Sequence, residues 1–285
     1  MKIRYFGDKI VYIMGASTGT GLAAARLLAG RGARVMLFSR SRGKLEKALA
    51  EVQASALDSA AGSTTRQRFA YKTLDISRND EVRRALEGAV KDFGVPDILI
   101  NSVGMARPDY FENISYEQFD EIQKTNLYGT WNTCSVLVPH MKKKGGYIVN
   151  VSSAGGFVGT FGYTDYSASK FGVLGFSEAL RAELKPWNIT VSVLCPASID
   201  SPGYLEENRN KPAETHAIEG NAGLMSPDFV AKKLIKGMGR GKLIITPNFM
   251  GKVAFLAKRF VPGLMEAVFD GDVKKAQQNK KKNEG

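Results

Sequence analysis

Ser153, Tyr166 and Lys170 are the residues whose types and spacing could do chemistry. Tyr166 and Lys170 are four positions apart, so on a helix their side chains lie on one face. An ammonium beside a phenol favours the phenolate, so we predict that Lys170 lowers a Tyr166 pKa that starts near ~10. A phenol tuned in this way can exchange a proton with a substrate oxygen, which Ser153 would also hydrogen-bond. The pair alone is weak evidence for a catalytic site, because tyrosine and lysine fall four apart on many exposed helices.

A glycine-rich loop near the N-terminus separates a predicted strand from a predicted helix. Residues 9–14 are apolar and rich in β-branched residues, and GASTGTG and the helical pattern LAAARLLAGRG follow. A dinucleotide pyrophosphate binds at such a junction, against free backbone N–H groups at the helix N-terminus. We therefore predict cofactor contacts at Gly15, Gly19 and Gly21, with a turn that binds no ligand as the alternative.

The end of the second predicted strand, residues 33–38, indicates which dinucleotide is bound. An acidic residue there binds a free ribose 2′-hydroxyl, whereas an arginine nearby accommodates a 2′-phosphate. Arg40 follows the strand, Lys44 lies one turn further on, and no acidic residue is present. This pattern predicts NADPH rather than NADH, and the alternative is a solvated basic surface.

Strands and helices continue to alternate, which predicts a single Rossmann-type domain over residues 1–247, an α/β fold. Its doubly wound parallel sheet should have about seven strands, with helices on both faces. The third strand ends near Asp75, which could contact the adenine, and the fourth runs into a turn at Asn101 to Gly104 that passes under the cofactor. Further strands are predicted within residues 145–153, 189–198 and 242–247, and helices over residues 45–61, 79–94 and 164–185.

Asn126 lies inside a helix predicted over residues 115–142. A buried amide in a helix needs hydrogen-bond partners. We therefore predict that Asn126 takes part in a polar relay to Lys170.

Residues 198–226 are rich in proline, glycine, asparagine and charge, with weak periodicity. A long irregular segment inside a compact domain is typically a lid or binding loop, so we predict a substrate loop here, with disorder as the alternative.

Residues 248–270 are predicted to form an amphipathic helical segment, broken near Pro262. We expect this segment either to pack on the Rossmann-type domain or on a partner subunit, or to make peripheral contact with a membrane surface. The basic tail, residues 271–285, is predicted to be disordered. Apolar residues recur at helical spacing in this segment at Phe249, Val253, Leu256, Phe260, Leu264 and Val268.

Composition and net charge limit the partners, metal sites and cellular location that this chain can have. The chain has 285 residues and a formal net charge of +12, which suggests an anionic partner such as a phosphorylated cofactor or a membrane surface. No nucleic-acid-reading motif is visible, and no apolar run is long enough to predict a transmembrane helix. Cys134 and Cys195 are far apart and the two histidines are isolated, so we expect reduced thiols, no metal site and a cytoplasmic location.

Taken together, these residues resemble the short-chain dehydrogenase/reductase family over about residues 9–247. The resemblance rests on GASTGTG, NSVG, Asn126, Ser153 and YSASK, in that order. It implies that Tyr166 is the proton donor in reduction, that Lys170 also contacts the nicotinamide ribose, and that Asn126 anchors a relay water. Met14 and NSVG stand where the family usually has threonine and NNAG. Cofactor contacts implied by the resemblance are Gly15, Ser17, Thr18, Gly19, Arg40, Lys44, Asp75, Tyr166 and Lys170.

A narrower resemblance covers the catalytic helix and the run SPGYLEENRNKPAET. It is to family members that reduce the 3-keto group of a long-chain sphingoid base, so it implies a long-chain keto-amine lipid substrate and NADPH. Glu206, Glu207 or Glu214 of the predicted substrate loop could meet the ammonium group of such a substrate. We also expect a homo-oligomer. The alternatives are a β-ketoacyl or hydroxysteroid reductase of the same family, or a non-catalytic NADPH-binding regulator or membrane scaffold.

Overall fold

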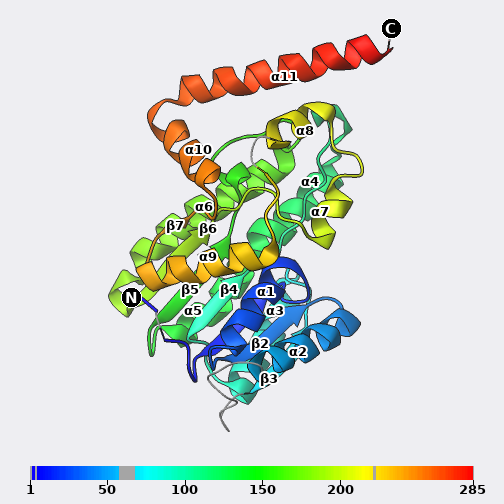
Figure 1. Ribbon diagram of the computed structural model, residues 1–285. Helices are drawn as coiled ribbons and strands as arrows, with labels where there is room; N and C mark the ends of the chain where they lie inside the picture. Colours follow the sequence, from blue (N-terminus) through cyan, green and yellow to red (C-terminus); the bar gives the residue numbers. More distant parts are fainter. Residues whose placement is uncertain (1, 4, 58–67, 221–222, 285) are drawn as a thin grey trace.

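Seven parallel strands form one sheet in the order β3-β2-β1-β4-β5-β6-β7 (Figure 1). The computed structural model describes residues 2–3, 5–57, 68–220 and 223–284. Because every neighbouring pair is parallel, all the carboxyl ends lie at one edge. β3 and β4 lie on opposite sides of β1, and ligands bind at such a reversal of strand order. The strands are β1 (Ile10–Met14), β2 (Arg34–Ser39), β3 (Phe69–Thr73), β4 (Ile98–Asn101), β5 (Gly146–Val151), β6 (Ile189–Leu194) and β7 (Ile244–Ile245).

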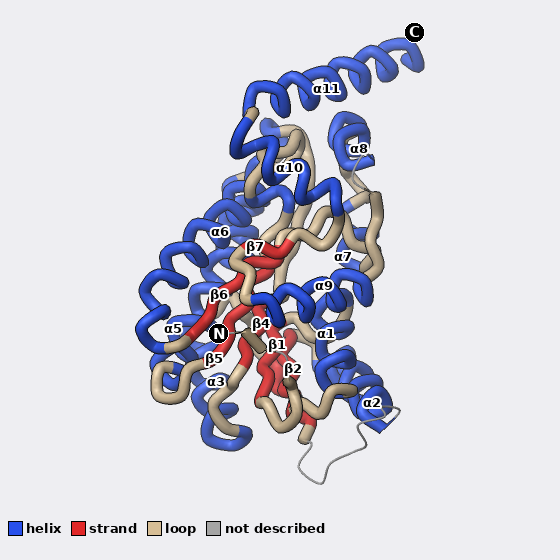
Figure 2. The backbone as a smooth tube through the Cα atoms, turned by 60° about the vertical axis from the view of Figure 1, so that its left-hand side comes forward, coloured by secondary structure: helices blue, strands red, loops and turns tan. Residues whose placement is uncertain are grey.

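Both faces of the sheet are covered by helices, which is why its central strands are continuous apolar runs. Val11 and Ile13 of β1 belong to one core cluster, whereas Tyr12 and Met14 belong to the cluster on the opposite face. Figure 2 shows the two helical layers on either side of the sheet. The first cluster is covered by α1 (Gly19–Ala29), α2 (Arg42–Leu57) and α9 (Pro227–Arg240), and the second by α3 (Asn79–Phe93), α5 (Gly129–Met141) and α6 (Thr164–Leu184).

The predicted doubly wound sheet of about seven strands is therefore confirmed. Residues 58–61 of the helix predicted over 45–61 lie outside the described residues. The long helix predicted over 115–142 is interrupted: α4 (Tyr116–Gln123) is followed by a π-helical turn, η2 (Lys124–Tyr128), and then by α5. Asn126 lies in this turn, and such π-helical turns are frequent at functional sites.

The predicted substrate segment, residues 198–226, contains two short helices that its weak periodicity did not reveal, α7 (Pro202–Glu207) and α8 (Ala213–Gly220). Ser201 caps α7 by accepting a hydrogen bond from the Tyr204 N–H, and Pro202 occupies the first helical position. The expectation of an irregular loop is thus corrected, because capping signals and packing define these helices.

Two C-terminal helices, α10 (Phe249–Phe260) and α11 (Pro262–Glu284), follow the sheet, and the predicted break near Pro262 is confirmed. Helix α11 continues through residues 271–284, which corrects the predicted disordered tail. That stretch is rich in lysine and also contains glutamine, which are good helix formers, and it contains no proline. Figure 1 shows α11 lying over α8, and the Lys280 ammonium lies 5.7 Å from the centroid of the Tyr110 ring.

One face of these two helices packs on the body, through residues that include Phe255, whose ring centroid lies 5.2 Å from that of Phe157. The six apolar residues singled out from the sequence are instead exposed: Phe249, Val253, Leu256, Phe260, Leu264 and Val268. Within the described part of the chain, no helix combines the length and the apolar character needed to cross a membrane.

The junction of the glycine loop and α1 leaves no room for a side chain at Gly21. A Cβ there would lie 2.3 Å from the Gly15 carbonyl oxygen, a backbone atom that cannot rotate away. We therefore expect Gly21→Ala to lower the free energy of unfolding by about 1–3 kcal/mol, as overpacking does. Urea unfolding followed by circular dichroism measures this. Gly43→Ala is the control, because a Cβ there meets no atom within 4 Å; equal stability of the two variants would contradict the expectation.

Candidate active site

A cavity of about 760 Å³ runs along the carboxyl edge of the sheet. Its walls come from the loops after the strands and from α7, α10 and α11, which lie beyond that edge. Ser153, Tyr166 and Lys170 and the predicted cofactor loop therefore face one space. The predicted site residues that line it are Gly15, Ser17, Thr18, Gly19, Arg40, Asp75, Gly104, Ser153, Tyr166 and Lys170.

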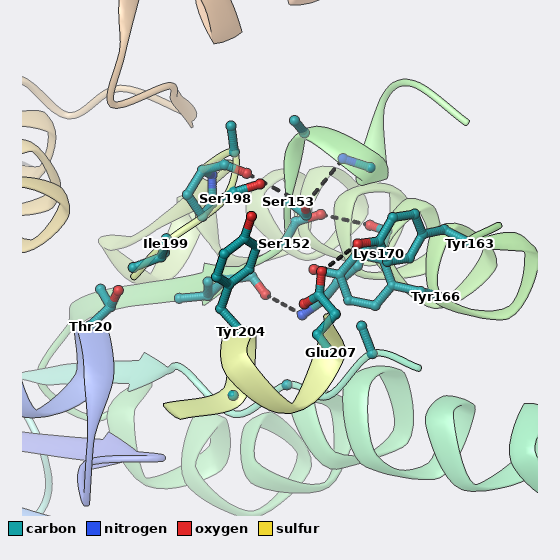
Figure 3. Close-up of a pocket in the computed structure, with 18 of the residues that line it drawn as sticks. Thr20, Ser152, Ser153, Tyr163, Tyr166, Lys170, Ser198, Ile199, Tyr204 and Glu207 are labelled. Carbon is teal, nitrogen blue, oxygen red and sulfur yellow. Dashed lines mark hydrogen bonds between the residues drawn. The ribbon is translucent and has the colours of Figure 1, made fainter. Parts of the chain in front are cut away.

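Three of the four residues predicted to take part in catalysis, Ser153, Tyr166 and Lys170, meet where β5 ends and α6 begins (Figure 3). Lys170 is only 2% exposed, and its ammonium donates a hydrogen bond to the Val151 carbonyl oxygen at 3.1 Å. The same nitrogen lies 5.6 Å from the centroid of the Tyr166 ring. Ser153 follows β5, and its hydroxyl oxygen accepts a hydrogen bond from the Gly155 N–H at 3.1 Å. A phenol, an ammonium and a hydroxyl thus border one space.

Burial dominates the ionisation of Tyr166. It raises the Tyr166 pKa far above the ordinary value, and the charges of Glu207 and Glu219 raise it further, whereas a hydrogen bond from Ser153 lowers it only in part. The prediction that Lys170 brings this pKa down therefore does not hold for the protein on its own. The physical reason is that loss of water penalises the phenolate more than its neighbours favour it. Tyr166 keeps its proton at neutral pH, which is the state of a proton donor.

Burial also lowers the pKa of Lys170 to about 8. The ammonium form still predominates at pH 7. The buried ammonium lowers the free energy of unfolding, because its surroundings compensate only in part for the hydration that it loses.

Asn126 does not line the cavity but holds two parts of its wall together. Its side-chain amide donates to the Met105 carbonyl oxygen at 3.0 Å and to the Ser169 hydroxyl at 2.9 Å, and its carbonyl accepts from the Met105 N–H at 2.9 Å. It thereby ties the turn after β4 to α6 beside Lys170. A Cβ at Gly104 would lie 3.0 Å from the Lys170 nitrogen and 3.7 Å from the Asn126 Oδ1.

Three residues predicted as cofactor contacts lie outside the cavity lining. Asn101 is 1% exposed, donates to the Asn150 Oδ1 at 2.8 Å and accepts from the Thr133 hydroxyl, so it belongs to a polar network in the core. Gly21 packs on the Gly15 backbone, and Lys44 lies on the exposed surface of α2. Their positions in the sequence made these three residues candidates, but the folded chain places their side chains or backbone away from the cavity.

The start of α1 fits an anionic dinucleotide. Thr20 lines the cavity, and its buried hydroxyl has no hydrogen-bond partner among the described residues. The capping residue Thr18 makes no side-chain cap, and the first turn of α1 holds no acidic residue. Free N–H groups and the positive end of the helix dipole therefore face the cavity, as pyrophosphate binding requires. Gly15 adopts a φ of +76°, and a Cβ there would lie 2.8 Å from the Ser102 carbonyl oxygen.

Sequence reasoning missed several residues of this site. Thr20 and Glu219 line the cavity, as do Tyr163 and the apolar Leu74 and Ile76 that border Asp75. Tyr163 could have been found, since it directly precedes the predicted catalytic helix and is three positions before Tyr166. The place of Glu219 depends on the unpredicted helix α8.

The comparisons with known proteins agree with this fold. The family model described as short chain dehydrogenase matches residues 9–212. The chain therefore belongs to the short-chain dehydrogenase/reductase family, which confirms the resemblance inferred from its motifs.

Two relatives within that family are reductases of sphingoid bases by name, as the narrower resemblance implied. The 3-ketodihydrosphingosine reductase of Dictyostelium discoideum is 35% identical over 271 residues, which cover 92% of this chain and 80% of that protein. The 3-dehydrosphinganine reductase of Danio rerio is 34% identical over 233 residues, covering 81% of this chain and 68% of that protein. A short chain dehydrogenase/reductase from Burkholderia phymatum in complex with NAD shares the fold, with a TM-score of 0.79 at 21% identity over 92% of this chain and 97% of that one.

The buried ammonium of Lys170 leads to a pH-dependent stability. Its pKa is lower in the folded than in the unfolded chain, so its cost is complete below pH 8 and disappears as the pH rises towards 10.5. We expect Lys170→Met to raise the free energy of unfolding at pH 7 by on the order of 1–3 kcal/mol. The gain should shrink between pH 8 and 10.5 in urea unfolding. Lys143→Met, at an exposed position, is the control; a gain that is absent, or unchanged at pH 10.5, would contradict this account.

Proposed function

We propose that this protein reduces the 3-keto group of 3-ketodihydrosphingosine to the alcohol of dihydrosphingosine, a step of sphingolipid biosynthesis, with NADPH as the reductant. The observation that carries the proposal is the meeting of Ser153, Tyr166 and Lys170 in a cavity that also borders the glycine loop. The sequence similarity to reductases of this substrate supports it.

The chain's own residues supply the proton chemistry. NADPH, when bound, supplies the hydride that is added to the carbonyl carbon. The hydroxyls of Ser153 and Tyr166 donate hydrogen bonds to the carbonyl oxygen, where negative charge grows in the transition state. Tyr166, protonated at neutral pH, gives its proton to that oxygen, and the ammonium of Lys170 stabilises the phenolate that remains. We further propose that Asn126 anchors a relay water through which the Tyr166 phenolate regains its proton.

The preference for NADPH over NADH is supported by the end of β2. Arg40 lines the cavity there, and residues 39–41 contain no carboxylate to bind a free 2′-hydroxyl. Arg40 would bind the 2′-phosphate, the loop from Gly15 to Gly19 the pyrophosphate, and Asp75 would border the adenine.

The apolar wall of the cavity supports a substrate with a long alkyl chain. Met250, Val253, Leu264 and Val268, from α10 and α11, line the cavity, and each is between 41% and 65% exposed. One apolar surface therefore continues from the cavity to the outside, so an alkyl chain bound by its keto end can extend along it.

The outer side of these helices suits peripheral contact with a membrane. Phe249 and Phe260 are 76% and 77% exposed, and Lys252 and Arg259 flank them. Apolar residues beside lysine and arginine bind anionic bilayers by burial and charge attraction together. We propose a cytoplasmic protein that docks on anionic lipid in this way and forms a homo-oligomer.

Membrane docking can be tested with vesicles. The full chain should sediment with vesicles of phosphatidylcholine and phosphatidylserine, and the bound fraction should fall at high salt because charge attraction is screened. The double variant Phe249→Ser, Phe260→Ser should bind more weakly, whereas Phe111→Ser, exposed elsewhere, should bind as the wild type does. Equal sedimentation of all three proteins, or none for the wild type, would contradict this interface.

The activity can be tested by following NADPH consumption with 3-ketodihydrosphingosine, with NADH in a parallel assay. We expect turnover that is faster with NADPH. Tyr166→Phe keeps the ring but removes the proton, so kcat should fall at least ~10²–10⁴-fold. Tyr116→Phe, at an exposed position, should leave kcat unchanged.

Three outcomes would overturn parts of this proposal. Near-normal turnover by Tyr166→Phe would refute the proton donor. Faster reduction of β-ketoacyl thioesters or ketosteroids than of the keto-amine would favour the alternative substrates. NADPH binding with no turnover of any of these ketones would favour a non-catalytic regulator or scaffold.

A further inference from the structure

Glu207, on α7, stands beside Tyr166 in the cavity wall (Figure 3). Glu206 and Glu214, the other acids of the substrate segment named from the sequence, do not line the cavity. Glu206 is exposed and pairs with Arg209 at 2.9 Å, and Glu214 is buried and accepts a hydrogen bond from the Tyr110 hydroxyl. The structure therefore separates one loop carboxylate from its neighbours by position.

A partly buried network of hydrogen bonds and ion pairs holds the Glu207 carboxylate in place. The Tyr163 hydroxyl donates to Glu207 and lies 2.7 Å from the Glu219 Oε1. The Lys211 ammonium, whose side chain is 0% exposed, binds the Glu207 Oε1 at 3.0 Å and the Glu219 Oε2 at 2.6 Å. Each of these contacts to Glu207 uses its Oε1. Its Oε2 accepts no hydrogen bond from the described residues, so one acceptor remains in the cavity wall.

The network also leaves a negative charge beside the catalytic tyrosine. Two carboxylates face one ammonium, which gives a formal charge of −1 in a chain whose total is +12. The Tyr163 and Tyr166 ring centroids are 5.4 Å apart, and the charges of Glu207 and Glu219 act on the Tyr166 hydroxyl. A charge removed from bulk water is stabilised by an opposite charge that hydrogen-bonds to it.

We propose that Glu207 is a specificity-determining residue that binds the ammonium group of a 2-amino-ketone substrate through its Oε2. This inference rests on the proposed function. In such a substrate the ammonium is on the carbon next to the carbonyl. An anion beside Tyr166 is therefore within reach when the carbonyl oxygen faces the Tyr166 hydroxyl. Binding brings the charge of the network to zero, and Tyr163 and Lys211 orient the carboxylate beforehand.

Glu207→Gln tests this role, because it keeps the shape and one acceptor oxygen but removes the charge. Two substrates are compared: 3-ketodihydrosphingosine, and 1-hydroxyoctadecan-3-one, which has the same chain but no amine. We expect kcat/KM for the keto-amine to fall about 10- to 100-fold, the size of a lost charge-assisted hydrogen bond, and kcat/KM for the deaminated ketone to stay within about 3-fold. Glu206→Gln is the matched control and should leave both values unchanged.

Equal losses on both substrates would show that Glu207 only supports the fold of the substrate segment, which overturns this inference and leaves the proposed function intact. If the wild type does not reduce the keto-amine, the proposed function fails and this inference fails with it. If Glu207→Gln does not fold, the wild type still gives a test with the N-acetylated keto-amine, which has no charge. Its kcat/KM should be at least 10-fold lower than that of the free amine, and equal values would overturn the inference.

Discussion

The ammonium group of Lys170 has to remain charged where water hardly reaches it, and the surrounding structure depends on that requirement. The end of β5 supplies the Val151 carbonyl as its acceptor, and Gly104 leaves the space above it. Asn126, in the π-helical turn, donates a hydrogen bond to Ser169, the residue that precedes Lys170. A rigid parallel sheet with a glycine-lined edge can hold a charged group in this position, and it gives up some stability in doing so.

The same burial sets the protonation state of Tyr166. Low hydration and two nearby glutamates raise the pKa of Tyr166, so the phenol is protonated at neutral pH, which is the state that the proposed proton donor requires. The helices beyond the sheet edge add to this effect, because α7 and α8 carry those glutamates and α10 and α11 close the apolar side. The core of the fold thus supplies the reacting groups, and the later segments supply their surroundings.

The sheet could be predicted from the sequence because its signals are local. The apolar run of β1, the glycine turn and the residue pattern of α3 each lie within about twenty residues, and the family motifs appear in order. Features that depend on distant contacts could not be predicted. The pKa of Tyr166 is set partly by Glu207 and Glu219, which are remote in sequence, and the amide of Asn101 turns towards Asn150 rather than the cofactor cavity. Lys211 has no exposed side chain although it lies in a polar loop sequence, because Glu207 and Glu219 enclose it.

The order of the strands has a consequence for synthesis of the chain. β1, β2 and β3 can pair as soon as they leave the ribosome, but the second edge of β1 is covered only by β4, which ends at Asn101. Until then the nascent protein presents an unpaired strand edge with apolar side chains on both faces, and such an edge readily pairs with other chains. Chaperone binding during translation should therefore concentrate on β1 in the interval before β4 emerges.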